Sequence, residues 1–416
     1  MKLLWLCNMV PGAVKEAITG QPGNGRWVDH VLQDLRRQED LTIRILCRYS
    51  QEVSGRVDGH CSYHTFPAGA PHRYSDSLEA WFAEELRAFA PDVIHSWGVE
   101  YAHTLAMVRA AEKTGLSHRM AVSIQGLCGY IAYHYCEGLP SWVRNGFTLR
   151  DLLRLDNIAR QQKKFFLRGE LERQTLQGVQ HIIGRTCWDR ACTAAIHPEA
   201  AYHICNETLR PVFYQGQWEY EMCRKHRIFA PGCSYPVKGF HHLLVAFGQI
   251  AEKYPDAVIS VPDASYLTVL PVRRSSYQKY LAELTRKYGL ENRIEFLGSL
   301  TAEGMKRAYL EANVFVLPST IENSPNSLGE AMLLGVPCVA ADVGGVTTML
   351  THDTEGYVYQ STAPYMLAHY LETVFSMEAS AADMGQAARR HGRKTHDPEK
   401  NLRDLMNIYS TLAKEA

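Results

Sequence analysis

Residues 312–335 constrain the fold of this chain more than any other stretch, because they have the pattern of a buried strand, a loop and a short helix in direct succession. The apolar run 312–317 is typical of a core strand, and the run 331–334 is typical of a helix that ends at Gly335. A loop between a strand and a helix points backbone N–H groups and the positive end of the helix dipole at whatever binds above the strand. The stretch therefore predicts an anion site in an α/β domain.

Two carboxylates bracket the predicted helix start. Glu322 lies in the loop, and Glu330 follows after seven intervening residues. A carboxylate accepts both hydrogen bonds of a vicinal diol, such as that of a ribose or a hexose. Between the two acids, we predict that the backbone amides of Asn326, Ser327 and Leu328 bind phosphate. The loop thus has the groups that a nucleotide sugar needs. The alternative interpretation is a pair of glutamates on a helix face that meet only solvent.

The rest of the chain alternates strand-like and helix-like stretches. The strand-like runs are 2–7, 41–47, 92–95, 120–124 and 180–186 in the first half, and 227–230, 258–261, 293–298 and 336–340 in the second. Such alternation predicts parallel sheets covered by helices on both faces, with ligands at the carboxyl ends of the strands. The expected fold class is therefore α/β with doubly wound, Rossmann-like domains.

Composition bounds the number of domains and the class of partner. The 416 residues fit two domains of about 200 residues each, and the pattern loosens around 205–225, where we place the crossover. Lys and Arg total 44, as do Asp and Glu, so net charge gives no argument for a nucleic acid partner.

Eleven cysteines without a Cys-x-x-Cys pair favour a reducing cytoplasm. The apolar opening 1–7 stops at Asn8, which indicates a first strand. No apolar run approaches the roughly 18 residues of a membrane-spanning helix.

Several loops of the first half are candidate ligand contacts. The glycine-bearing loop after the first strand suggests that Gly23 and Gly25 approach a donor phosphate, with a plain turn as the alternative. His95 and Trp97 stand at a strand end, where ring stacking and hydrogen bonding would suit an acceptor sugar. A buried and internally satisfied pair is the alternative there. Arg185 follows another strand and is expected near the same cleft.

The stretch 141–168 differs in character from the rest of the first half. It interleaves aromatic and leucine side chains with seven basic residues against two acids, a local excess of +5 in a neutral chain. Basic helices with exposed aromatic residues can lie on an anionic membrane surface, which would suit an acceptor anchored in lipid. A solvated helix face packed on the domain is the alternative.

The second half also carries a set of short motifs. They are Pro318-Ser319 before the two glutamates, Glu330-Ala331-Met332 and Gly335-Val336-Pro337 after the first of them, and Lys238-Gly239 in an earlier turn. Over residues 227–358 this set resembles the retaining glycosyltransferases of family 4, or glycosyl transferases group 1. The resemblance implies the GT-B fold, in which two doubly wound domains face each other and the last helix crosses back. It implies an acceptor domain at 1–208, a nucleotide-sugar donor domain at 209–392 and the returning helix at 393–416.

The resemblance also implies roles for residues at the matching positions. Glu322 would face the transferred sugar, Glu330 the ribose and Lys238 the diphosphate, so Glu322 and Lys238 are the expected catalytic residues. Backbone groups at strand ends, such as Gly298, would hold the base. No Asp-x-Asp sequence occurs, and we expect neither a metal nor another cofactor.

The chain departs from the family pattern at two places. Family members usually have an Arg about five residues before the Lys, but Cys233 and Ser234 stand there in this chain. Ser234 remains an expected donor contact, and Arg185 or Arg26 is a candidate replacement for the missing cation. Gln125 stands where the family commonly places a His near the donor sugar, so only hydrogen bonding remains to it.

The expected function is transfer of a hexosyl group from a nucleoside diphosphate sugar to a glycan or polyprenyl-linked acceptor, with the anomeric configuration retained. The expected setting is cell-surface polysaccharide synthesis in the cytoplasm, with peripheral membrane contact through 141–168. Donor base, donor sugar, acceptor and linkage are not specified by these motifs. The alternatives are a sugar-nucleotide-binding protein without catalysis, and an epimerase or phosphorylase on the same fold. The two departures favour the first alternative, and a phosphorylase would need a pyridoxal or phosphate site that has no motif here.

Overall fold

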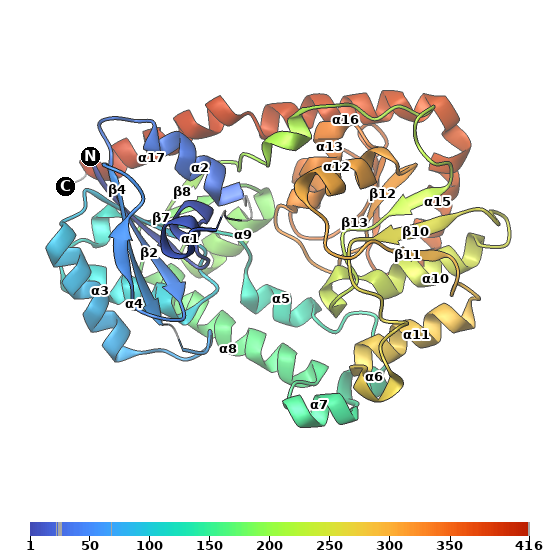
Figure 1. Ribbon diagram of the computed structural model, residues 1–416, viewed down its shortest axis with the longest axis horizontal. Helices are drawn as coiled ribbons and strands as arrows, with labels where there is room; N and C mark the ends of the chain where they lie inside the picture. The colour runs from blue at the N-terminus through green and yellow to red at the C-terminus, as the bar shows by residue number, and fades with distance from the viewer. Residues whose placement is uncertain (22, 24–26, 68, 415–416) are drawn as a thin grey trace. The chain divides into compact units, whose positions relative to one another are not determined.

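The computed structural model describes residues 1–21, 23, 27–67 and 69–414, and it divides into two compact units. Unit 1 consists of Met1–Tyr130, Phe165–Arg210 and His396–Ala416, and unit 2 of Ile131–Lys164 and Pro211–Thr395 (Figure 1). Each unit has its own parallel sheet, as the alternating pattern predicts.

Within its described residues, unit 1 is built on one eight-stranded sheet with the strand order β3-β4-β2-β1-β5-β6-β7-β8. All neighbours are parallel except β3 and β4, which are antiparallel. The chain adds strands first on one side of β1 and then on the other, so the topological switch point lies between β1 and β5. The strands are β1 (Lys2–Cys7), β2 (Thr42–Tyr49), β3 (Ser54–Arg56), β4 (Cys61–Pro67), β5 (Val93–Trp97), β6 (Met120–Ser123), β7 (His181–Gly184) and β8 (Ala201–Ile204).

Helices cover both faces of this sheet, which is why β1 is apolar along most of its length. Alternate residues of a strand point to opposite faces. Leu4 and Leu6 belong to one buried cluster, and Leu3 and Trp5 belong to the other. The helices of unit 1 are α1 (Gly12–Thr19), α2 (Trp27–Arg36), α3 (Asp76–Phe89), α4 (Ala102–Lys113), η1 (Ser117–Arg119), α9 (Cys187–Ile196) and α17 (Pro398–Lys414).

The last helix, α17, is tied to the sheet of unit 1 by a buried polar chain. The Tyr409 hydroxyl accepts from Trp5 Nε1 at 3.0 Å and lies 2.7 Å from His95 Nδ1. The other ring nitrogen of His95 lies 2.7 Å from the Ser123 hydroxyl. These side chains are buried, so each polar atom depends on its partner in the chain for a hydrogen bond. The amphipathic helix is thereby held in one register on β1 and β5.

Unit 2 is built, within its described residues, on a six-stranded, fully parallel sheet with the order β11-β10-β9-β12-β13-β14. Its switch point lies between β9 and β12, and the loops that follow these two strands meet there. The strands are β9 (Arg227–Phe229), β10 (Val258–Val261), β11 (Ile294–Phe296), β12 (Val314–Leu317), β13 (Cys338–Asp342) and β14 (Tyr357–Gln360). The helices that cover it are η2 (Pro211–Tyr214), η3 (Pro236–Lys238), α10 (Phe240–Ile250), η4 (Pro271–Arg273), α11 (Ser276–Lys287), α12 (Ala302–Leu310), α13 (Asn326–Leu334), α14 (Val346–Met349), α15 (Pro364–Met377), η5 (Glu378–Ser380) and α16 (Ala381–Thr395). The predicted fold class, α/β with two Rossmann-like domains, is confirmed.

One segment differs from the expected boundaries of 1–208 and 209–392. Residues 131–164 cluster with unit 2, and the chain changes unit within α5 (Cys128–His134) and α8 (Ile158–Gln177). Between these helices lie α6 (Ser141–Asn145) and α7 (Leu149–Arg154).

A buried carboxylate explains why this segment packs on unit 2. Asp151 accepts a hydrogen bond from the backbone N–H of Ser276 at 3.0 Å and closes a capping box with Thr148 at the start of α7. Val143 of α6 is fully buried as well. The local pattern indicates short helices, but it carries no information on which core receives them.

We expect Tyr409→Phe to lower the free energy of unfolding by about 2 kcal/mol, because the buried Trp5 and His95 nitrogens lose their partner. Urea unfolding followed by fluorescence measures the change. The matched control is Tyr365→Phe, since Tyr365 is exposed on unit 2 and should lose nothing measurable. Equal stability of the two variants would show that the polar chain does not hold α17.

Candidate functional site

The two loops at the switch point of unit 2 are held against each other by a glycine. Gly239 ends the loop after β9 with φ of 65°, and a Cβ at this position would overlap the carbonyl oxygen of Pro318, which follows β12. A backbone hydrogen bond from Thr320 N to Val237 O, 2.9 Å long, joins the same two loops. Only glycine satisfies both the left-handed conformation and this close approach. The neighbouring Lys238 is thus delivered to the loop that carries Glu322.

Lys238 and Glu322 form an ion pair with 2.8 Å between Nζ and Oε1. The Ser319 hydroxyl donates to the same carboxylate oxygen at 2.8 Å. Burial disfavours the charged form of Lys238, but Glu322 and Tyr235 outweigh this effect, and the pKa of Lys238 is raised. The lysine is therefore a fixed positive charge at neutral pH. The two expected catalytic residues are brought together, with a serine that sequence analysis did not select.

A second glycine shapes the loop of Glu322 from the other side. Gly344 has φ of 51°, and a Cβ there would overlap the carbonyl oxygen of Glu322. Gly345 donates its N–H to the same oxygen at 3.0 Å. Sequence analysis did not predict this contact, since the two segments are separated by a helix and a strand. The Gly-Gly pair at the end of a strand was the available signal.

The start of α13 presents free backbone donors. Its N-cap residue is Pro325, which provides no side-chain cap. Within the described part of the chain, the N–H groups of Asn326 and Ser327 donate to no acceptor. The N–H of Leu328 differs from the prediction, because it already donates to Pro325 O at 3.0 Å. Two of the three predicted amides are therefore available to an anion, and the helix dipole favours one there.

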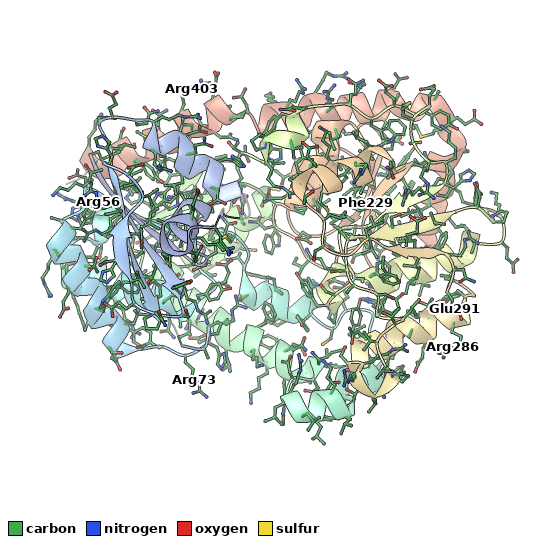
Figure 2. The ribbon with its side chains drawn as sticks, in the orientation of Figure 1. Arg56, Arg73, Phe229, Arg286, Glu291 and Arg403 are labelled. Atoms are coloured by element: carbon green, nitrogen blue, oxygen red, sulfur yellow. The ribbon has the colours of Figure 1, made fainter. Side chains whose placement is uncertain are left out.

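Glu330 is buried in the second turn of α13, with 5% of its surface exposed. Its Oε2 lies 3.3 Å from the Tyr309 hydroxyl, which also donates to the carbonyl of Ser327 at 2.9 Å. The Tyr309 ring packs edge-on against Phe229 of β9. Figure 2 labels Phe229 in unit 2. Neither acid of the pair faces bulk water, since the Glu322 side chain is only 14% exposed. The solvent-face alternative for the two glutamates does not describe this structure.

The turn where the family has an arginine is organised by a carboxylate instead. Asp263 accepts from the backbone N–H of Cys233 at 2.6 Å, and its carbonyl accepts from Gly298 N at 3.2 Å. It therefore ties together the loops after β9, β10 and β11. Burial, followed by the charge of Asp263, raises the pKa of the Cys233 thiol, so this residue adds no charge. Ser234 lies in a small polar pocket that Arg150, Tyr235 and Gln278 also line.

His134 contacts the loop that carries Glu322 through its backbone. Its carbonyl accepts from the Thr320 hydroxyl at 3.0 Å, and its Nδ1 lies 2.8 Å from Glu137. Because residues 131–164 cluster with unit 2, the backbone of His134 lies against the loop that carries Glu322. Sequence analysis did not select this residue.

The predicted acceptor contacts of unit 1 are largely engaged within the fold. His95 is buried with both ring nitrogens paired, and burial lowers its pKa to about 3, so it is neutral. Trp97 is buried beside it and meets Trp5 edge-on. These contacts support the alternative of a buried, satisfied residue for His95, whereas Trp97 also lines a pocket with Gln125 and Arg185.

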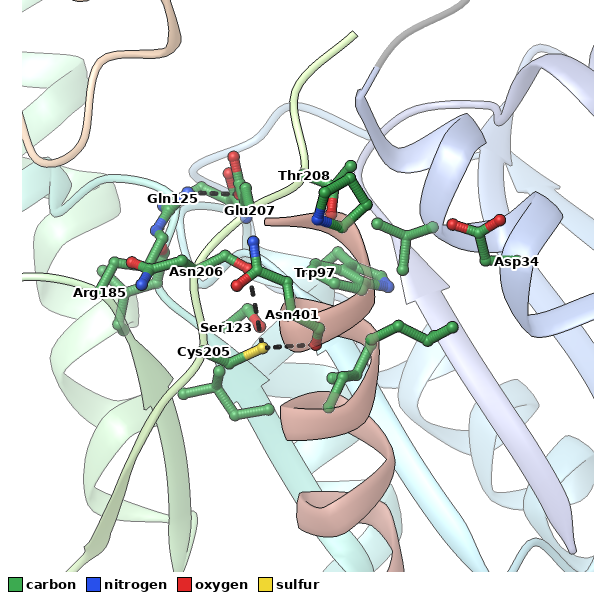
Figure 3. Close-up of a pocket in the computed structure, with 16 residues that line it drawn as sticks. Asp34, Trp97, Ser123, Gln125, Arg185, Cys205, Asn206, Glu207, Thr208 and Asn401 are labelled. Atoms are coloured by element: carbon green, nitrogen blue, oxygen red, sulfur yellow. Dashed lines mark hydrogen bonds and ion pairs between the residues drawn. The ribbon is translucent and has the colours of Figure 1, made fainter. Parts of the chain in front are cut away.

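Arg185 and Gln125 share one partner in unit 1. Arg185 forms a buried ion pair with Glu207, and Gln125 Nε2 donates to the same carboxylate at 2.9 Å (Figure 3). The Arg185 charge is therefore already matched inside unit 1. Sequence analysis missed Glu207, for which the only signal was an acid just before the crossover.

The glycine loop of unit 1 is only partly described. Gly23 packs on α1, because a Cβ there would overlap the backbone of Gly12. Gly25 and Arg26 lie outside the described residues.

A polar cluster stands at the switch point of unit 1. Asn8 donates to Glu100 at 3.1 Å and lies 2.7 Å from Nε2 of His103. Gly98 has φ of +102°, and a Cβ there would overlap both Asn8 and Glu100. Burial raises the pKa of Glu100. These residues follow β1 and β5, where ligands of doubly wound sheets bind.

Comparison with known proteins identifies the segment that carries the site in unit 2. Residues 224–391 match the sequence profile of the family described as Glycosyl transferases group 1. This match supports the family part of the resemblance over the segment that holds Lys238, Glu322 and Glu330.

Curated relatives match a limited part of the chain. The D-inositol 3-phosphate glycosyltransferase of Corynebacterium diphtheriae is 30% identical over 159 residues, which cover 37% of this chain and 35% of that protein. The protein of the same name from Corynebacterium urealyticum is 27% identical over 181 residues, or 42% of this chain and 41% of that one. The matched segment thus spans about two fifths of these relatives at most.

Solved structures match over the whole length. The sucrose-phosphate synthase of Thermosynechococcus elongatus has a TM-score of 0.74 and 16% identity, covering 100% of both chains. HepE of Anabaena, in complex with UDP-glucose, has a TM-score of 0.68 and 14% identity, covering 99% of this chain and 100% of that one. At these identities the similarity establishes the fold, and the fold is GT-B.

We expect Gly239→Ala to destabilise unit 2 by about 3 kcal/mol or more, because the new methyl group cannot coexist with the Pro318 carbonyl. The matched control is Gly289→Ala, since Gly289 has φ of +64° but open space around it. That variant should cost only about 1 kcal/mol, the strain of a left-handed alanine. Urea unfolding measures both. Similar losses would mean that the two loops are not in close contact.

Proposed function

We propose that the protein transfers a hexosyl group from a nucleoside diphosphate sugar to a glycan hydroxyl, with retention of the anomeric configuration. The observation that carries this proposal is the Lys238–Glu322 ion pair at the switch point where α13 offers two free amides. A cation, free N–H donors and an acid meet there within the segment that matches a glycosyl transferase family.

The donor would bind across the loops of unit 2. The diphosphate would accept hydrogen bonds from the N–H groups of Asn326 and Ser327 and from the Lys238 ammonium group. Glu322 would then exchange its lysine partner for hydroxyl groups of the transferred sugar. Glu330, held by Tyr309, would accept from the ribose hydroxyls. Backbone groups near Ser234 and Gly298 would contact the base.

The chemistry then follows from where charge develops. The bond between the anomeric carbon and the leaving phosphate oxygen breaks, and the acceptor oxygen bonds to the same face of the sugar ring. The acceptor proton passes to the departing phosphate oxygen. Lys238 and the two amides stabilise the negative charge that builds on the diphosphate, a preorganised interaction that requires no divalent cation. Glu322 orients the sugar and is not the nucleophile in this scheme.

The acceptor would bind to unit 1 at its own switch point. The polar cluster of Asn8, Glu100 and His103 offers donors and acceptors for sugar hydroxyls, whereas His95 and Trp97 are committed to the core. The names of two relatives specify an inositol phosphate, and one neighbour was solved with UDP-glucose, which supports a nucleotide-sugar donor and an acceptor that carries hydroxyl groups. A glycan or polyprenyl-linked sugar, in cell-surface polysaccharide synthesis at the cytoplasmic side of the membrane, is the acceptor and setting that we propose.

The second candidate is a protein that binds sugar nucleotides without transferring the sugar. It is favoured by the turn at Cys233, where the family arginine is missing, and by the neutralised Arg185. Arg26 is then the remaining candidate from the sequence for the second cation.

We expect Glu330→Ala to weaken binding of the matching nucleoside diphosphate by about tenfold to a hundredfold, because two charge-assisted hydrogen bonds to the ribose are lost. Calorimetric titration with UDP, GDP, ADP and TDP identifies the base and measures the change. Glu303→Ala on α12, an exposed acid outside the site, is the control and should bind like the native protein. Unchanged affinity of the Glu330 variant would contradict the ribose assignment.

We expect Lys238→Ala to lower the rate of sugar transfer by about a hundredfold or more, because the leaving diphosphate loses its fixed cation. Transfer from a labelled donor measures the rate, and NMR of the product gives the anomeric configuration, which should match that of the donor. A chelator should leave the native rate unchanged.

If the Lys238→Ala variant transferred sugar at the native rate, Lys238 would not be the residue that stabilises the leaving diphosphate. Tight nucleotide binding by the native protein, with neither transfer nor hydrolysis for any acceptor tested, would favour the second candidate.

A further inference from the structure

We propose that one face of unit 2 docks on a bilayer surface that carries anionic lipids. This docking face comprises eight exposed apolar side chains: Trp142, Phe147, Leu149, Leu152, Leu153, Leu155, Leu270 and Val272. Six of them come from the 131–164 segment, and two come from the loop that contains η4.

The exposure of these side chains is unusual in both extent and clustering. Their exposed fractions run from 49% to 76%, and they account for eight of the fifteen large hydrophobic residues that are exposed among the described residues. The two stretches are neighbours, since α7 packs on η4 and α6 packs beside α11 (Figure 1). Single exposed leucines are ordinary, whereas a contiguous apolar patch marks a surface that binds something.

The charges around the docking face identify what it binds. Arg144, Arg154 and Arg273 stand among the apolar side chains, and within the described part of the chain none of the three forms an ion pair with an acid. Each of the three acids of the 131–164 segment has a partner: Glu137 lies beside His134, buried Asp151 pairs with Arg150, and Asp156 pairs with Lys164. The outward charge is therefore positive. The apolar side chains suit the acyl region of a bilayer, and the arginines without an acidic partner suit its anionic headgroups.

The docking face is also preformed. Buried Val143 and the hydrogen bond from Ser276 to Asp151 fix α6 and α7 on unit 2, so their outward leucines are held in place without a partner. Among the described helices, none combines the length and apolar character that crossing a bilayer requires. The contact is therefore with the surface of the membrane, with leucine and tryptophan side chains in the headgroup region and arginines on phosphates.

The docking face lies next to the turn after β9 that ends at Lys238. Arg150 of α7 lines the same small pocket as Ser234 and Tyr235, in the turn that ends at Lys238. A membrane contact at α7 would hold this turn close to the lipid surface. That position suits an acceptor carried on a lipid.

Vesicle sedimentation with the full-length protein tests the proposal. The native protein should bind vesicles of phosphatidylcholine with phosphatidylglycerol, and it should bind pure phosphatidylcholine vesicles weakly. The double variant Leu152→Ser/Leu153→Ser should bind the anionic vesicles about tenfold more weakly or worse, because two side chains no longer enter the headgroup region. The variant Arg144→Gln/Arg154→Gln/Arg273→Gln should lose the preference for anionic vesicles, and added salt should weaken native binding.

The control is Met222→Ser/Tyr365→Ser, which removes two exposed apolar side chains of unit 2 outside the docking face. It should bind vesicles like the native protein, and thermal unfolding should show that all variants are folded. Failure of the native protein to bind anionic vesicles would overturn the proposal, as would native-like binding by the leucine variant. Light scattering that shows oligomers abolished by the leucine variant, without vesicle binding, would overturn it in favour of a protein interface.

Discussion

The close contact between two loops of unit 2, with the backbone of Gly239 against the carbonyl of Pro318, is the constraint on which the proposed site depends. It brings Lys238 within 2.8 Å of Glu322 at the carboxyl ends of β9 and β12, the topological switch point of the sheet in unit 2. A partly buried ion pair of this kind contributes little net stability, because desolvation of both charges offsets their attraction. Its value here is preorganisation, because both groups are already fixed in place before a ligand binds. The diphosphate would then become the partner of the Lys238 ammonium group, and the sugar would become the partner of the Glu322 carboxylate.

Sequence reasoning predicted the parts of the structure that depend on local periodicity. The strand, loop and helix at 312–335 and the parallel sheets follow from runs of a few residues. The family resemblance assigned Lys238 and Glu322 to one site, but their ion pair was not predicted. Phosphate binding by the three amides stays a prediction. The sequence did not show that α13 opens with a tight turn in which the Leu328 N–H donates to Pro325 O.

What could not be predicted depends on contacts between distant segments. Three features join parts of the chain that are far apart in sequence. They are the contact of Gly344 with Glu322, the ion pair of Arg185 with Glu207, and the packing of residues 131–164 on unit 2. An amphipathic helix specifies that it will be half buried, but any core with a matching groove can receive it. Likewise, the basic character of Arg185 is visible in the sequence, whereas its neutralisation is visible only once Glu207 is placed beside it.

The most direct measurement is a crystal structure of the protein with the nucleoside diphosphate that binds best. The diphosphate should lie within hydrogen-bonding distance of the Asn326 and Ser327 amides and of Lys238, with the ribose hydroxyls on Glu330. A nucleotide bound elsewhere, with these amides left to water and the Lys238–Glu322 pair intact, would contradict the proposed site.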